Sequence, residues 1–64
     1  MSRERAESLA NEGINLYRRD CLREALRSYT ETLAICRELR DQAWEGTTLN
    51  NLGLVYHSLV LCQV

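Results

Sequence analysis

The side chains that could do chemistry in this chain are few and widely spaced. The sequence holds one histidine, His57, and no motif places a serine or cysteine nucleophile, or a pair of carboxylates, beside it. Catalysis needs a base within hydrogen-bond reach of its partner and a third group that orients it. We therefore expect His57 to be a polar residue on a helix face, and we expect the chain not to be an enzyme.

The cysteines and glycines give no cofactor or metal pattern either. Cys21, Cys36 and Cys62 are odd in number and stand in no metal-ligand spacing, so a disulfide framework or a zinc site is not expected. Buried, reduced thiols are the favoured interpretation, and they suit the cytoplasm. The glycines are dispersed and form no phosphate-binding loop. A net charge of −1 gives no basic excess for a nucleic-acid partner.

The elements that would position these residues are helices. The chain has no proline and is rich in Leu, Ala, Glu and Arg, which predicts an all-α fold. The first helix is expected to begin just after Ser2, its N-cap. Its apolar face, at three- and four-residue steps, consists of Ala6, Leu9, Ala10, Gly13, Leu16 and Tyr17. Gly13 in the middle of this face predicts close approach of another helix.

A second helix is expected after a connection of about three residues, with Asp20 as its N-cap and Glu24 in its first turn. Its predicted apolar face is Leu22, Ala25, Leu26, Tyr29, Leu33 and Cys36, flanked by Ile35 and Leu39. Because the connection is short, the two helices should form an antiparallel hairpin.

A third helix is expected from about Gln42 to about Leu61, with Asp41 as its N-cap and Glu45 in its first turn. Its predicted apolar set is Leu49, Leu52, Gly53, Tyr56, Leu59 and Val60, with Leu54, Val55 and Leu61 on other sides. The stretch Gly46–Val64 has no formal charge if His57 is neutral. We expect something to cover this helix, since exposed helices usually carry charge on their outer face. No membrane span is expected, because polar residues interrupt the stretch and it is short.

The first and third predicted helices resemble each other. A shift of forty residues aligns Leu9 with Leu49, Asn11 with Asn51, and Gly13 with Gly53. A period of this length is typical of a solenoid built from helix pairs.

These residues resemble the tetratricopeptide repeat (TPR) family. Leu52, Gly53 and Tyr56 match the Leu-Gly pair and following aromatic of its first helix, and the stretch containing TLNNLG is similar to long-period, kinesin-light-chain-like bacterial repeats. In the upstream unit Gly13, Ala25 and Tyr29 match. The residues with predicted packing roles are Gly13, Ala25, Tyr29, Leu52, Gly53 and Tyr56. Glu12, Thr32 and Trp44 depart from the family pattern.

The resemblance implies a fold and a binding site. The fold is an antiparallel helical hairpin plus a third helix, about one and a half TPR-like units, with repeat one at about 3–40 and an incomplete repeat two at about 41–64. In such arrays the first helices line a concave groove, where asparagines bond the backbone of an extended peptide. The implied peptide-binding residues are Asn11, Asn50, Asn51, Leu54, Tyr17 and His57. The alternative is that the asparagines are ordinary polar surface residues.

Two functions remain open from the sequence. One is a non-catalytic, cytoplasmic scaffold module that binds a protein or peptide. The other is a structural, oligomerising or truncated repeat element without its own ligand, which self-associates through Gly46–Val64. One and a half repeats should be marginally stable alone, so we expect either a fragment of a longer array or a chain that self-associates through the third helix.

Overall fold

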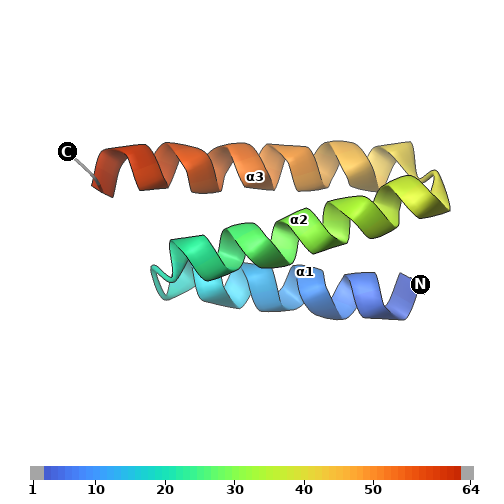
Figure 1. The fold of residues 1–64 in the computed structure, drawn as a ribbon, viewed down its shortest axis with the longest axis horizontal. Coiled ribbons are helices and arrows are strands. Elements are labelled where there is room, and N and C mark those ends of the chain that lie inside the picture. Colours follow the sequence, from blue (N-terminus) through green and yellow to red (C-terminus); the bar gives the residue numbers. More distant parts are fainter. Residues whose placement is uncertain (1–2, 63–64) are drawn as a thin grey trace.

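The protein is three α-helices arranged side by side in a computed structural model that describes residues 3–62. They are α1 (Arg3–Arg18), α2 (Leu22–Leu39) and α3 (Gln42–Cys62). Figure 1 shows α2 between α1 and α3, with α1 and α3 running in the same direction and α2 opposite to both. The predicted all-α hairpin with a third helix is confirmed. Ser2, the expected N-cap of α1, lies outside the described residues.

The turn between α1 and α2 corrects one prediction. Asp20 has a left-handed backbone with φ 62°, and its N–H donates to the Tyr17 carbonyl at 3.1 Å. The next N–H, of Cys21, donates to the Leu16 carbonyl at 2.9 Å, which completes a Schellman motif. Asp20 therefore ends α1 and does not cap α2. Cys21 takes the N-cap position of α2 and makes no side-chain capping bond.

The turn between α2 and α3 repeats this geometry. Arg40 is left-handed with φ 56°, and the N–H groups of Arg40 and Asp41 donate to the carbonyls of Arg37 and Cys36 at 3.1 and 3.0 Å. Here the predicted cap is confirmed, because the Asp41 Oδ1 accepts the Trp44 N–H at 3.1 Å. An aspartate at this position satisfies an N–H group that has no partner within the helix.

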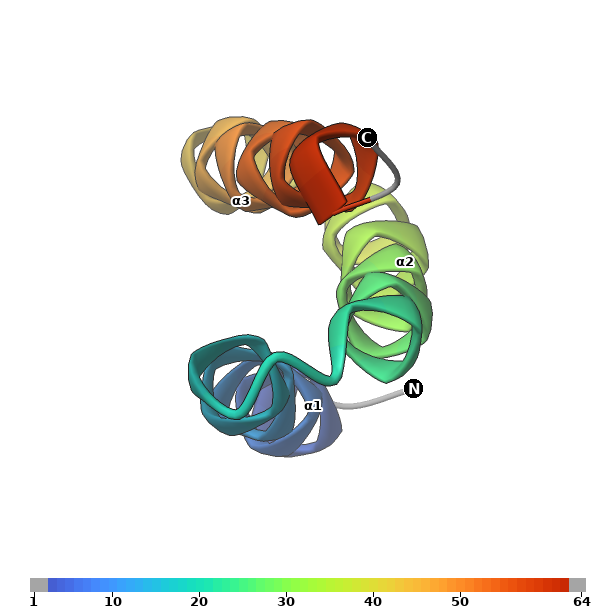
Figure 2. The same ribbon diagram turned by 90° about the vertical axis from the view of Figure 1, so that its left-hand side faces the viewer.

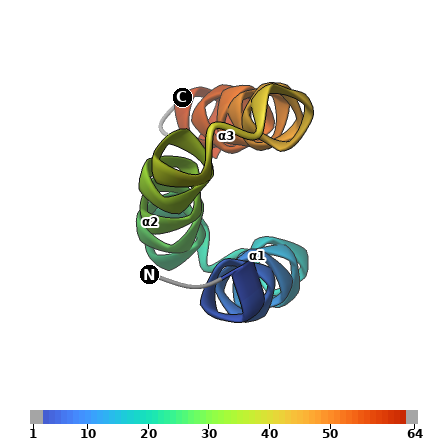
Figure 3. The ribbon, with the colours of Figure 1, turned by 90° about the vertical axis from the view of Figure 1, so that its right-hand side faces the viewer.

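The core lies where α2 contacts its two neighbours. Figures 2 and 3 show the three helices forming a C, with α2 as its back. The buried hydrophobic residues are Ala6, Leu22, Ala25, Tyr29, Leu33, Ile35, Cys36, Leu52 and Val55. Ile35, which we expected at the flank of its helix, is only 1 % exposed. It is buried because α2 has neighbours on two sides, so more of its circumference is covered than one apolar face predicts.

Small hydroxyl residues are buried with this core. Thr32 and Thr48 are fully or almost fully buried, and their hydroxyls donate within their own helices to the carbonyls of Ser28 and Trp44, each at 2.9 Å. Such bonds satisfy the hydroxyl without a partner on the other helix. Thr32, a departure from the family pattern, is therefore compatible with a dry interface.

The face of α3 that packs on α2 differs from the predicted one. Thr48, Leu52 and Val55 are buried, whereas Leu49, Tyr56 and Val60 of the predicted apolar set are 46, 54 and 63 % exposed. The predicted single apolar face is therefore wrong. Helix α3 is apolar around most of its circumference, so periodicity could not select which side meets α2. No helix within residues 3–62 has the length and apolar character needed to cross a membrane.

Candidate functional site

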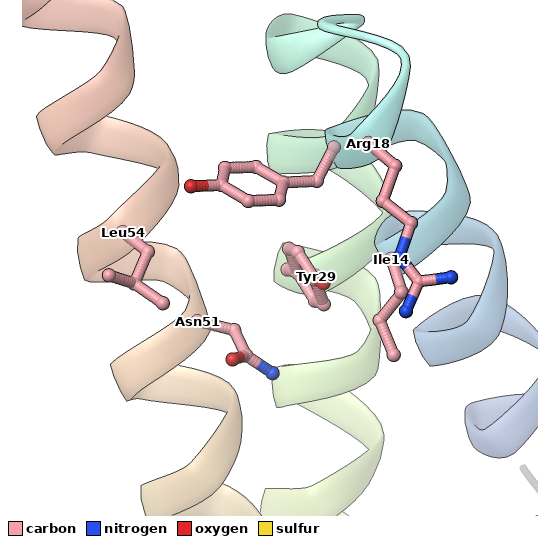
Figure 4. A pocket seen from close by; sticks show the side chains of 6 residues that line it. Ile14, Arg18, Tyr29, Asn51 and Leu54 are labelled. Atoms are coloured by element: carbon pink, nitrogen blue, oxygen red, sulfur yellow. The ribbon is translucent and has the colours of Figure 1, made fainter.

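A pocket of about 240 Å³ that is open to solvent lies between the helices. All three contribute side chains to it, as Figure 4 shows. The lining residues are Ile14, Tyr17, Arg18, Tyr29, Asn51 and Leu54. The pocket therefore depends on the packing of the whole chain and not on any single helix.

Helical spacing explains how the walls form. Ile14 and Arg18 stand four residues apart on α1, and Asn51 and Leu54 stand three apart on α3, so each pair projects from one side of its helix. Figure 4 shows the α3 pair across from the α1 pair, with Tyr29 of α2 between them. One wall of the pocket offers an amide beside an apolar group, and the other offers a guanidinium beside an apolar group.

Tyr29 forms the floor and is 4 % exposed. Burial raises the pKa of the Tyr29 hydroxyl, Tyr17 raises it further, and the positive charge of Arg18 lowers it. The hydroxyl consequently stays protonated at neutral pH and keeps its capacity to donate a hydrogen bond. The Tyr29 ring also lies against Gly13, where an added Cβ would come within 3.0 Å of a ring carbon. The glycine thus lets α1 approach the ring closely.

Direct contacts between α1 and α3 follow the register seen in the sequence. The Tyr17 hydroxyl lies 3.3 Å from the Ser58 Oγ, a pair separated by 41 positions. At the other end of the two helices, an Arg3 Nη1 lies 3.1 Å from the Asp41 Oδ2, and the Arg3 guanidinium lies 5.3 Å from the centre of the Trp44 ring. An offset close to forty therefore describes which residues of α1 and α3 lie across from each other. Trp44, another departure from the family pattern, participates through a cation–π contact.

The six predicted peptide-binding residues divide into two groups. Tyr17, Asn51 and Leu54 line the pocket. Asn11, Asn50 and His57 are exposed and do not line it. Asn11 stands three residues before Ile14 on α1, one turn from the pocket wall.

Sequence reasoning missed three lining residues: Ile14, Arg18 and Tyr29. A signal existed for the first, because the forty-residue shift aligns Ile14 with Leu54. Arg18 then follows one helical turn later on the same side. Tyr29 was assigned to packing alone. It forms the floor of the pocket because α1 and α3 lie apart over this part of α2.

The residues with predicted packing roles also divide. Ala25, Tyr29 and Leu52 are buried in the core, and Gly13 is buried against Tyr29. Within residues 3–62, a Cβ added to Gly53 would meet nothing within 4 Å, and Tyr56 is 54 % exposed. Nothing in the described part of the chain provides the packing predicted for these last two residues.

The thiols have distinct surroundings. Cys36 is buried, and its Sγ lies 3.9 Å from the Thr48 Oγ1. Burial is the main cause that raises the pKa of the Cys36 thiol, and the contact with Thr48 partly opposes it. It stays protonated and is therefore a poor nucleophile. Cys21 is free and partly buried, and the Cys62 side chain lies outside what the structure describes. Among the described residues, no group of His, Cys, Asp and Glu is placed to hold a metal ion.

No family model, curated protein or solved structure matches this chain.

Proposed function

We propose that the chain is a non-catalytic protein-binding module whose concave pocket takes an extended segment of a partner protein. The observation that supports this most is the pocket itself. It brings Asn51, Leu54 and Arg18 together from two helices that are far apart in the sequence.

The chemistry of the pocket suits a peptide. The Asn51 amide offers both a donor and an acceptor, which matches the two polar groups of a peptide unit. Leu54 and Ile14 give apolar walls for a side chain, and the Arg18 guanidinium suits a carboxylate. We therefore expect a segment with an apolar residue next to an acidic one.

A TPR-like scaffold is the architecture that we propose for this function. Two observations support it: α1 and α3 run in the same direction, with a direct contact between residues 41 positions apart, and both inter-helix turns use the same left-handed geometry. We also propose a cytoplasmic location, supported by the free thiols of Cys21 and Cys36.

Selection from a displayed library of random twelve-residue peptides tests the proposal. The chain should enrich peptides that pair an apolar with an acidic residue, and synthetic copies should bind it measurably by calorimetry. Asn51→Ala should weaken binding about tenfold, the equivalent of about 1.4 kcal/mol. Leu54→Asp should weaken it more, because it replaces an apolar wall of the pocket with a charged group and adds a negative charge to a pocket that must take an acidic segment.

The matched control is His57→Ala, since His57 is exposed on the same helix outside the pocket. It should leave affinity unchanged. The proposal fails if no peptide is enriched, or if Asn51→Ala and Leu54→Asp bind the enriched peptides as tightly as the unaltered chain does.

A further inference from the structure

Helix α3 carries a second feature, on a different side from the pocket and from the core. Its members recur at alternating steps of three and four residues, and all are exposed. We call it the outer stripe: Gly46, Leu49, Gly53, Tyr56 and Val60. It carries no formal charge and includes three of the large exposed hydrophobic residues of the chain. An exposed apolar stripe of this kind marks an interaction surface.

The α1 residues that correspond to the two glycines of the stripe are buried. The forty-residue shift aligns Gly46 with Ala6 and Gly53 with Gly13, and both of these α1 residues are buried against α2. Gly13 in particular lies against the Tyr29 ring. The outer stripe thus has the composition of a helix-packing face but meets no helix within residues 3–62.

Charge restricts which partner can cover the stripe. Under the forty-residue shift, the residues of α3 that pack in the core correspond to exposed polar residues of α1 and of the turn that follows it. Glu12 and Arg19 are the charged residues among them. If copies stacked head to tail, these charged side chains would be buried against the outer stripe. Their charges would lose water without gaining ion-pair partners. The exposed faces of α2 are also charged, with Arg23, Arg27 and Glu31 among their exposed residues. The outer stripe is the uncharged surface that suits another outer stripe.

We propose that the outer stripe binds the outer stripe of a second copy of this chain, with the two α3 helices antiparallel around a two-fold axis at Gly53. The spacing is self-complementary in this register to within one residue. Gly53 faces Gly53 of the other copy, Leu49 faces Tyr56, and Gly46 faces Val60. The absence of side chains at the axis allows the two backbones to approach closely, and at the outer layers a smaller residue meets a larger one. This inference does not depend on the peptide pocket, which uses another side of α3.

Sedimentation equilibrium of the whole chain gives the first test. The average mass should rise from that of a monomer toward that of a dimer as the protein concentration increases. The Tm should also rise with protein concentration, because dimer formation stabilises the folded chain. A monomeric mass at every concentration up to about 0.5 mM would overturn the proposal, because a symmetric interface used in solution should be detectable there.

Two neighbouring residues provide a matched pair of variants. Val60 and Leu61 are 63 and 62 % exposed, but only Val60 belongs to the stripe. Tyr56→Glu near the centre of the stripe should raise the dimer dissociation constant at least about a hundredfold, and Val60→Glu at its end should raise it about tenfold. Leu61→Glu should leave it unchanged. Circular dichroism should show the same helical content in all three, because none of these side chains is in the core. Equal effects of Val60→Glu and Leu61→Glu would contradict the assigned stripe.

Mixing two charged variants tests the register. Leu49→Arg and Tyr56→Glu should each prevent homodimer formation, whereas a mixture should form a heterodimer, since the new arginine then faces the new glutamate. Recovery of a dimer in the mixture supports the antiparallel register. A mixture that stays monomeric while the unaltered chain dimerises would overturn it.

Discussion

Helices α1 and α3 share Leu, Asn and Gly at three positions related by the forty-residue shift, but they meet α2 through different sides. Helix α1 buries Ala6 and Gly13 against α2, whereas α3 leaves the equivalent residues, Gly46 and Gly53, exposed. Helix α3 instead turns another side toward α2, with Val55 completely buried. Because α2 lies between them, each helix approaches it from the opposite direction (Figure 1). Two helices with shared spacing therefore acquire different cores, and the packing face of one becomes the outer surface of the other.

The two outward edges differ accordingly. The edge of α1 is polar and includes the exposed charges of Glu12 and Arg19, whereas the edge of α3 is apolar and its last charged residue is Glu45. A polar edge needs no cover, while an apolar one does. The difference between the edges means that the α3 edge, and not the α1 edge, is the one we expect to associate.

The largest expected effect comes from placing a bulky side chain at each of the equivalent glycines. Gly13→Leu should lose about 3 kcal/mol of unfolding free energy, because the new side chain must displace the Tyr29 ring from a site that already holds it within 3.0 Å of an added Cβ. Gly53→Leu should gain up to about 1 kcal/mol, because it replaces a poor helix former in open space. Urea unfolding followed by circular dichroism measures both.

Both glycine variants are compared in the Tyr56→Glu chain, so that dimer formation does not enter the measurement. Similar losses of unfolding free energy in Gly13→Leu and Gly53→Leu would contradict the different surroundings described for the two glycines.

A smaller effect should distinguish the inner and outer sides of α3. Leu52 is 7 % exposed and Leu49 is 46 % exposed, although sequence periodicity assigned both to one apolar face. Leu52→Ala should cost about 2–3 kcal/mol, since it leaves a cavity against α2. Leu49→Ala should cost less than about 1 kcal/mol in the monomer. Chemical unfolding of the two variants, each made in the Tyr56→Glu chain, measures the two losses of unfolding free energy. Equal losses would show that α3 is rotated from the described orientation.

The smallest expected effect concerns the start of α3 and its contact with α1. The Trp44 N–H first, and then the Arg3 guanidinium, hold the pKa of the Asp41 carboxyl below its ordinary value of 3.8. A carboxyl whose pKa is lower in the folded chain contributes stability above the unfolded pKa and loses it as the pH falls through the folded pKa. Asp41→Asn keeps a capping oxygen but has no charge, so it should unfold at a lower Tm than the unaltered chain near neutral pH.

This difference in Tm should shrink as the pH is lowered from above 3.8, the ordinary pKa, through the lowered pKa of the Asp41 carboxyl in the folded chain. Thermal unfolding at several pH values, at one protein concentration, measures it. A difference that stays constant across this range would mean that the Asp41 charge does not stabilise α3.

The sequence by itself determined the three helices, their short connections and the antiparallel hairpin. Apolar residues at three- and four-residue steps, the absence of proline and a good cap at Asp41 are local features, and local features set helix position. The forty-residue shift also gave the register between α1 and α3, which the Tyr17–Ser58 contact follows. Asp20 was misassigned because an aspartate can either cap the next helix or end the previous one in a left-handed turn.

Only the tertiary structure decided which sides of these helices are buried. Periodicity placed Leu49 and Leu52 together because α3 is apolar all round, and it left out Ile14 and Arg18 because neither lies on the predicted apolar face of α1. The pocket exists because α1 and α3 approach the two flanks of α2 as the arms of a C and leave Tyr29 between them. That direction of approach is a property of the packed helices and not of any one of them. For the same reason, Gly13 and Gly53 match in sequence, yet one lies against an aromatic ring and the other lies in open space.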